Sequence, residues 1–159
     1  MSVTIRPAAR EDAALIHAFI RELAEYEKLT EDVTASEADI ARSLFCASPR
    51  VFCDIAEWNG EPAGFALWFY NFSTFRGAHG IYLEDLFVRP QFRGHGLGKA
   101  LLVNLAQRAV AEGCARVEWA VLDWNAPSIA FYQSLGAVPM DEWTVFRLTG
   151  KALEKLAAT

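Results

Sequence analysis

Residues 81–88 read Ile-Tyr-Leu-Glu-Asp-Leu-Phe-Val, and residues 93–99 read Arg-Gly-His-Gly-Leu-Gly-Lys. The first stretch is mostly apolar and is stopped by a proline, so it predicts a β-strand. The second opens residues 97–112, which predict a helix. N–H groups at a helix start lack partners, and glycines let an anion approach them. Strand, turn and helix therefore form a candidate phosphate cradle at the amides of residues 94–99, where Arg93 and Lys99 add charge.

This glycine turn has a second interpretation, a tight strand-to-helix connection whose glycines serve packing alone. The spacing excludes two better-known phosphate motifs. A P-loop needs four residues between its glycine and a Gly-Lys-Ser/Thr, and a dinucleotide fingerprint needs GxGxxG in a βαβ unit near the domain start. Neither is present.

Upstream of this block, the sequence predicts one strand and two helices. The strand covers residues 2–6, and an apolar stripe at three- and four-residue steps predicts a helix as far as about Tyr26. Polar residues 27–35 are expected to form a loop. Ser36, followed three residues later by an aspartate, is typical of a helix cap and predicts a short helix ending near Pro49.

The remaining elements complete a mixed sheet. Val51–Trp58 and Pro62–Phe72 predict two strands joined by a hairpin at Asn59-Gly60. Further along, the pattern predicts a strand at Val117–Leu122, a helix at Pro127–Leu135, a strand at Trp143–Leu148 and a short terminal helix. We expect an α/β (α+β) fold with helices on both faces of the sheet, and not a Rossmann alternation.

Composition limits the functional classes. The chain has 159 residues, 53% of them hydrophobic, which suits a single domain over residues 1–159. A net charge of −5 without a basic patch argues against nucleic acid, and no apolar run is long enough for a membrane span. Three histidines are scattered, so no metal site is expected. An odd set of cysteines and no signal peptide predict a reduced, cytoplasmic protein: Cys46, Cys53 and Cys114.

A second motif, Trp124-Asn125-Ala126-Pro127-Ser128-Ile129-Ala130-Phe131-Tyr132, follows the next strand. Pro127 suits the first turn of a helix, and Asn125 is then a natural cap. Tyr132 falls on the second turn. A capping asparagine and a packed tyrosine would explain these residues without a function.

The two motifs together resemble the GCN5-related N-acetyltransferase (GNAT) superfamily, and within it the diamine acetyltransferases that act on spermidine, spermine or thialysine. The likeness also includes Ile5-Arg6-Pro7-Ala8 and Glu22-Leu23-Ala24-Glu25-Tyr26-Glu27. It implies the GNAT fold, with a mixed central sheet of six to seven strands, and acetyl-CoA as cosubstrate without a metal. The cosubstrate contacts that it implies are Leu86, Phe87, Val88, Arg93, Gly94, His95, Gly96, Leu97, Gly98, Lys99, Asn125, Pro127 and Ser128.

The resemblance also implies catalytic roles. Tyr132 matches the general acid that protonates the leaving thiolate of CoA. An ammonium of pKa near 10.4 must lose a proton before attack, at a cost of about 4 kcal/mol at pH 7, and Glu84 is the candidate carboxylate. Strict alternation puts Glu84 and Asp85 on opposite faces of the strand. A charge satisfied at a sheet edge or by an arginine is the structural alternative for this pair.

The acceptor expected from the resemblance is a primary amine of a small cationic metabolite. Residues lining its site by the same resemblance are Tyr26, Glu27, Glu84, Glu118, Trp119 and Ala120, with Asp141 or Glu142 aligned less securely. One cosubstrate contact of the family falls near Leu135. The resemblance further implies a homodimer. A GNAT enzyme acting on a peptide or protein amine, and a non-catalytic acetyl-CoA-binding module, are the alternatives.

Overall fold

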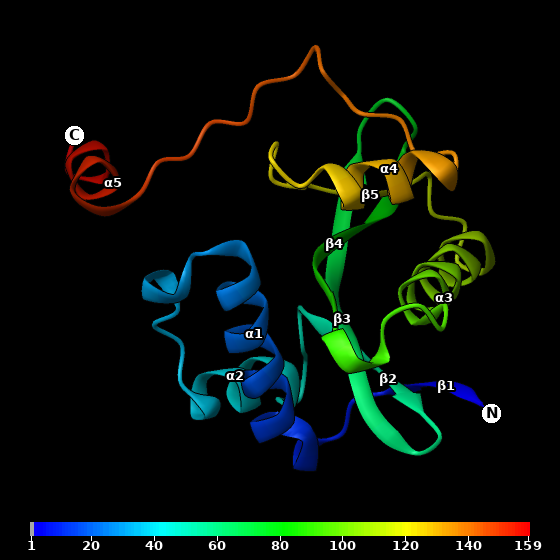
Figure 1. Cartoon of the computed structure of the whole chain (residues 1–159). Helices are drawn as coiled ribbons and strands as arrows, with labels where there is room; N and C mark the ends of the chain where they lie inside the picture. The colour runs from blue at the N-terminus through cyan, green and yellow to red at the C-terminus, as the bar shows by residue number, and fades with distance from the viewer. Residues whose placement is uncertain (1) are drawn as a thin grey trace. The chain divides into compact units, whose positions relative to one another are not determined.

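The computed structural model describes residues 2–159 (Figure 1). They fall into two compact units, divided after Ala120. The first unit contains one five-stranded sheet in the order β1-β2-β3-β4-β5. The pairs β1–β2, β2–β3 and β3–β4 are antiparallel, and the pair β4–β5 is parallel. The strands are β1 (Val3–Pro7), β2 (Phe52–Trp58), β3 (Glu61–Ser73), β4 (Ala78–Val88) and β5 (Val117–Trp119).

Helices cover both faces of this sheet, as predicted. α1 (Ala13–Glu27) and α2 (Glu37–Leu44) lie on one face, and α3 (Leu97–Ala111) packs against the other (Figure 1). Three single 3-10 turns join these elements: η1 (Arg10–Asp12), η2 (Thr30–Asp32) and η3 (Pro90–Phe92). The core beneath α1 and α2 is a cluster of apolar side chains: Ile16, Phe19, Leu44, Cys53, Ile55, Phe65, Leu67 and Phe87.

Local signals explain where several elements begin and end. The Ser36 hydroxyl accepts a hydrogen bond from the Asp39 amide at 3.1 Å, and the Asp39 carboxylate accepts one from the Ser36 amide at 2.8 Å. This capping box confirms the predicted start of α2, although α2 ends at Leu44, before Pro49. Asn59 and Gly60, with φ of 50° and 84°, form the predicted hairpin between β2 and β3.

β4 carries one extra residue at Glu84. Leu67 of β3 pairs with Asp85, but the next residue of β3, Trp68, pairs with Leu83. Such a bulge breaks the alternation of side chains. Strict alternation, the premise for placing Glu84 and Asp85 on opposite faces, is therefore wrong at this point. Asp85 shares the α1 face with its partner Leu67, whereas Leu83 shares the α3 face with Trp68.

The bulge coincides with the point where β4 and β5 separate. Their parallel pairing runs from Ile81 and Val117 to Leu83 and Trp119 and stops there. Beyond Leu83, β4 continues along β3 alone among the described strands, as far as the pair Gly64 and Val88. β5 is consequently shorter than the Val117–Leu122 strand expected from the sequence.

The second unit contains two helices, α4 (Ala126–Ser134) and α5 (Gly150–Ala157). Within the described residues, the predicted strand Trp143–Leu148 forms no ladder, and Val145 and Phe146 are 86% and 93% exposed. The sheet thus has five strands and not six to seven. A strand-like pattern states only that a segment can pair. A partner edge must also accept it, and this depends on contacts distant in sequence.

Candidate active site

The glycine turn leaves the start of α3 open. Gly94 and Gly96 have φ of 85° and 79°, in the left-handed region that favours glycine, and nothing lies within 4 Å of a Cβ built on either one. Gly96 is the N-cap of α3, and no side chain caps the helix. The first amides of α3 therefore face open space without a side-chain acceptor, an arrangement that suits an anionic group.

An aromatic pair fixes one side of this turn. The His95 ring stacks on Trp58 at the end of β2, with ring centroids 4.2 Å apart and planes inclined by 14°. Sequence reasoning selected His95 but missed Trp58, because the two residues are far apart along the chain. No local signal could have shown that β2 ends beside the turn.

Arg93 fixes the other side. Its Nε donates a hydrogen bond to the Val88 carbonyl at 2.9 Å. Its guanidinium carbon lies 5.1 Å from the centre of the Tyr26 ring and 5.7 Å from that of Phe87. Arg93 thus joins the turn to the end of α1 and to β4, and the exposed Lys99 is the cation at the helix start.

Downstream of the bulge, one edge of β4 carries no strand within the described residues. Leu86, Phe87 and Val88 pair with Ala66, Phe65 and Gly64 of β3 on the other edge. A strand edge presents backbone N–H and C=O groups that an extended ligand can pair with. The free edge leads directly into the glycine turn.

Three carboxylates lie within electrostatic range of one another near the end of α1. Burial raises the pKa of Asp85 to about 7, and the negative charges of Glu84 and Glu27 add to the effect. Burial also raises the pKa of Glu27, in the last turn of α1, where the helix dipole disfavours an anion. Glu84 is exposed. Sequence reasoning named Asp85 only as the neighbour of Glu84, because the family resemblance places its carboxylate at Glu84.

A polar group beside the aromatic residues of β4 and β3 extends this acidic region. Glu118 of β5 accepts hydrogen bonds from Asn71 at 3.1 Å and from Arg116 at 2.8 Å. Burial raises the pKa of Tyr82, and the charges of Glu84 and Glu118 raise it further. The Tyr82 ring lies 5.2 Å from that of Phe69. The other two residues predicted here are Trp119, half-buried, and Ala120, exposed just beyond β5.

The second unit holds the remaining predicted residues together on α4. The Asn125 side chain accepts a hydrogen bond from the Ser128 amide at 3.4 Å, and Pro127 stands in the first turn, so the predicted cap is confirmed. Tyr132 is half-buried on the next turn, its ring 5.6 Å from that of Phe131. Leu135 caps the C-terminal end of α4, and the less secure candidates Asp141 and Glu142 are exposed.

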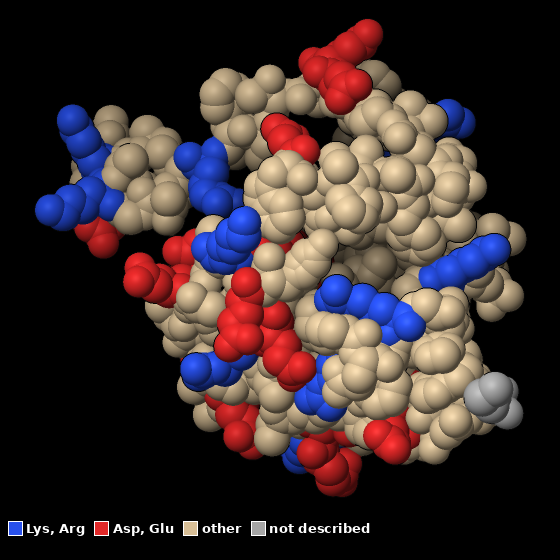
Figure 2. Space-filling model, viewed as in Figure 1, with Lys and Arg blue, Asp and Glu red and all other residues tan. Residues whose placement is uncertain are grey.

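The charged side chains of residues 2–159 form no metal site of the usual kind, and those on the face in Figure 2 form no nucleic-acid surface. Basic and acidic side chains intermingle on the face shown in Figure 2, without a continuous basic surface. No group of three or more histidine, cysteine, aspartate or glutamate side chains in these residues is arranged to hold a metal ion. No described helix is both long and apolar enough to cross a bilayer.

Comparison with known proteins identifies the family. Residues 15–137 match the acetyltransferase (GNAT) family. A thialysine N-epsilon-acetyltransferase of Bos taurus is 39% identical over 166 residues, covering 98% of this chain and 97% of that protein. An L-ornithine N5-acetyltransferase of Arabidopsis thaliana is 32% identical, covering 96% and 86% of the two chains.

A solved structure shares the fold over the full chain. An integron cassette protein from the mobile metagenome of V. cholerae superposes with a TM-score of 0.83 at 31% identity, covering 100% of this chain and 99% of that one. The match to the family spans both the glycine turn and the α4 motif. The chain therefore belongs to the GNAT family of acetyltransferases and is an acetyl-CoA-dependent N-acetyltransferase.

Proposed function

We propose that this enzyme acetylates a primary amine of a small cationic metabolite, such as a diamine, a polyamine or a thialysine-like amino acid. The carrying observation is the cluster of Glu27, Glu84 and Asp85, in which burial and mutual repulsion raise the pKa of Asp85. A cation entering this cluster relieves the repulsion between the carboxylates. Tyr82, whose pKa the charge of Glu84 raises, lies near the cluster, and its ring suits an alkylammonium ion.

The relatives support an amine of this kind. One acts on the ε-nitrogen of thialysine and another on N5 of ornithine, according to their names. Both match nearly the full length of this chain. The acidic cluster accounts for such a preference by charge alone, because a peptide amine without a second cation would leave part of the cluster uncompensated.

We propose that Asp85 is the base that accepts the proton from the amine. Glu84, the carboxylate expected from the sequence, then binds the incoming ammonium ion at the exposed side of the cluster. The pKa of an ordinary carboxylate is about 6 units below that of an alkylammonium ion, so proton transfer between them is unfavourable by about 8 kcal/mol. A pKa of about 7 at Asp85 halves that gap to roughly 3 units, or about 5 kcal/mol. Asp85 is thus the better matched base.

The residues that would hold acetyl-CoA fit the group in two respects. The free edge of β4 at Leu86, Phe87 and Val88 offers backbone partners to an extended arm, and the open start of α3 suits a pyrophosphate. Bound there, the thioester supplies the activated acetyl group. In this proposal Asn125, Pro127 and Ser128 contribute further contacts, and the Tyr132 hydroxyl donates a proton to the departing sulfur.

Three wider expectations belong to the same proposal. The chain acts as one domain over residues 1–159, and it works in the cytoplasm, in keeping with three free cysteines. It also forms a homodimer. The apolar side chains exposed in the second unit, among them Trp143, Val145 and Phe146, suit a surface that a partner covers. A monomer in light scattering at micromolar concentration would contradict the dimer.

The acceptor is tested by a panel of amines offered with acetyl-CoA, with release of the free thiol as the readout. Diamines, polyamines, thialysine and ornithine represent the proposed class, and short lysine peptides represent the protein-directed alternative. We expect turnover on cationic small amines and little on peptides. Turnover on peptides alone would refute the proposed acceptor, and CoA binding without any turnover would favour a non-catalytic module.

A further inference from the structure

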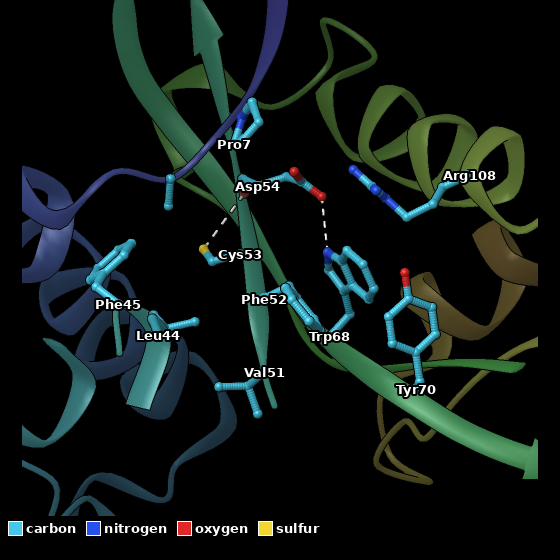
Figure 3. A pocket seen from close by; sticks show the side chains of 11 residues that line it. Pro7, Leu44, Phe45, Val51, Phe52, Cys53, Asp54, Trp68, Tyr70 and Arg108 are labelled. Atoms are coloured by element: carbon cyan, nitrogen blue, oxygen red, sulfur yellow. Dashed lines mark hydrogen bonds between the residues drawn. The ribbon is translucent and has the colours of Figure 1, made fainter. Parts of the chain in front are cut away.

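A pocket outside the acetyl-transfer site lies in the first unit at the place where β1 leaves the sheet (Figure 3). β1 pairs with β2 only as far as Pro7 opposite Asp54, so the beginning of β2 has no strand on that side within the described residues. The hollow there measures about 190 Å³. Sites for drug-sized ligands are roughly 300–1,000 Å³, so this pocket suits a smaller molecule. None of its lining residues belongs to the acetyl-transfer site proposed above.

The pocket has an apolar half and a polar end. Leu44 at the end of α2, Phe45 just after it and Val51 just before β2 form the apolar half (Figure 3). The carboxylate of Asp54 and the guanidinium of Arg108 point toward each other at the polar end, above the Trp68 indole. The lining therefore suits an amphipathic molecule that carries both charges at one end.

The Asp54 carboxylate is buried with half of its hydrogen-bonding capacity unused. Its residue is 3% exposed, and Oδ2 accepts from Trp68 Nε1 at 2.9 Å and from Asn104 Nδ2 at 3.3 Å. Within residues 2–159, Oδ1 receives no hydrogen bond. Burial raises the pKa of Asp54, while Arg108 lowers it without contacting it closely enough for an ion pair. A charged donor at Oδ1 would compensate this carboxylate.

Arg108 is equally short of partners. A guanidinium has five N–H donors, but the Nε of Arg108 is buried and has no acceptor among the described residues. The side chain makes one long contact, to Glu112 at 3.4 Å, and lies with its guanidinium carbon 5.0 Å from the centre of the Trp68 ring. An anionic acceptor in the pocket would supply the missing partner.

We propose that this pocket is a binding site for a free α-amino acid with an apolar side chain, whose ammonium group pairs with Asp54 and whose carboxylate pairs with Arg108. Ammonium and carboxylate share one carbon in such a molecule, so they reach two neighbouring groups of opposite charge together. The aliphatic side chain then fills the half formed by Leu44, Phe45 and Val51. An amine alone leaves the guanidinium unpaired, and a carboxylic acid alone leaves Asp54 unpaired.

The test is isothermal titration calorimetry of L-leucine into the full-length protein without acetyl-CoA. Isoamylamine, which lacks the carboxylate, and N-acetyl-L-leucine, which lacks the ammonium group, are the matched ligands. We expect L-leucine to bind and each analogue to bind at least about thirtyfold more weakly, the effect of losing one partner of a buried charge pair. Absence of L-leucine binding at millimolar concentration, or equal binding of an analogue, would overturn the assignment.

Two variants test which residues bind L-leucine. Asp54→Asn and Arg108→Gln should each weaken the binding of L-leucine by a similar factor, and circular dichroism checks that each variant is folded. If Asp54→Asn fails to fold, Arg108→Gln, which changes a half-exposed side chain, decides alone. Glu84→Gln should leave L-leucine binding unchanged. Loss of binding in Glu84→Gln, with retention in Arg108→Gln, would assign the amino acid to the acetyl-transfer site and refute the second site.

Discussion

Asp85→Asn gives the most informative perturbation, because the pKa of Asp85 makes stability and rate depend on pH in the same range. Its pKa rises from 3.8 in an unfolded chain to about 7 in the folded protein. Between these values the folded chain holds a proton that the unfolded chain has released, so the free energy of unfolding falls as pH rises from about 4 to 7. The shift of about 3 units corresponds to roughly 4 kcal/mol of lost stability above pH 7.

Asp85→Asn removes this titration. The free energy of unfolding of the variant minus that of the wild type should be roughly 3–4 kcal/mol larger at pH 8 than at pH 4. This is an upper value, because water reaches part of the Asp85 side chain. Urea unfolding at pH 4, 6 and 8, followed by tryptophan fluorescence, measures the difference. A stability difference between variant and wild type that is equal at all three pH values would refute the assigned burial of charge.

Glu84→Gln is the matched control on the neighbouring residue. Its charge raises the pKa of Asp85, so its removal should shift the stability transition to lower pH without abolishing it. The same pair of variants assigns the base. The rate at subsaturating amine should rise through about pH 7 in the wild type, shift to lower pH in Glu84→Gln, and lose this rise in Asp85→Asn. A shift to higher pH in Glu84→Gln would return the base role to Glu84.

The remaining predictions concern the cosubstrate side. Tyr132→Phe should lower kcat by about 10²- to 10⁴-fold, because it removes the proposed proton donor. The control Tyr70→Phe, which removes a hydroxyl bonded to Glu112, should not lower kcat. Full rate in Tyr132→Phe would mean that water donates the proton to the thiolate. Trp58→Leu removes the stack on His95 and should raise KM for acetyl-CoA by about 2- to 13-fold with kcat unchanged, the effect of losing one aromatic pair. The control Phe75→Leu, at an exposed ring, should leave KM unchanged. An unchanged KM in Trp58→Leu would show that the stack plays no part in cosubstrate binding. Gly96→Val should raise KM for acetyl-CoA about tenfold, because valine forces the turn out of its φ of 79°. The control Gly77→Val, at φ 62° in the hairpin between β3 and β4, should lower stability by a similar amount without changing KM. Equal effects on KM in the two variants would indicate general backbone strain.

Local patterns predicted much of the fold. The stripe of α1, the capping box of α2, the Asn59-Gly60 hairpin and the Asn125 cap each depend on residues within a few positions of one another, and all are present. The sheet was overestimated by a strand at Trp143–Leu148, whose pattern carries no record of a partner edge. The strand count required distant contacts that local periodicity does not encode.

The candidate site was predicted in its backbone elements more fully than in its side chains. The glycine turn and the end of β4 could be recognised because short-range geometry defines them. Asp85 was not selected because its burial near Glu27 depends on contacts distant in sequence. Trp58 was missed because it reaches the turn from another strand. Asn71 and Tyr82 likewise gain their place beside Glu118 only through cross-strand register. Side chains joined by sheet register are thus the part that a single sequence conceals.

The central claim is transfer of an acetyl group to a cationic amine held by the carboxylates of Glu27, Glu84 and Asp85. Its most direct test is mass spectrometry of the products after incubation with acetyl-CoA and an equimolar mixture of thialysine, a diamine, an uncharged-tail monoamine and a lysine peptide. We predict one acetyl group on thialysine or the diamine, and only trace acetylation of the monoamine and the peptide. Equal acetylation of the monoamine, or acetylation of the peptide alone, would contradict selection by the acidic cluster.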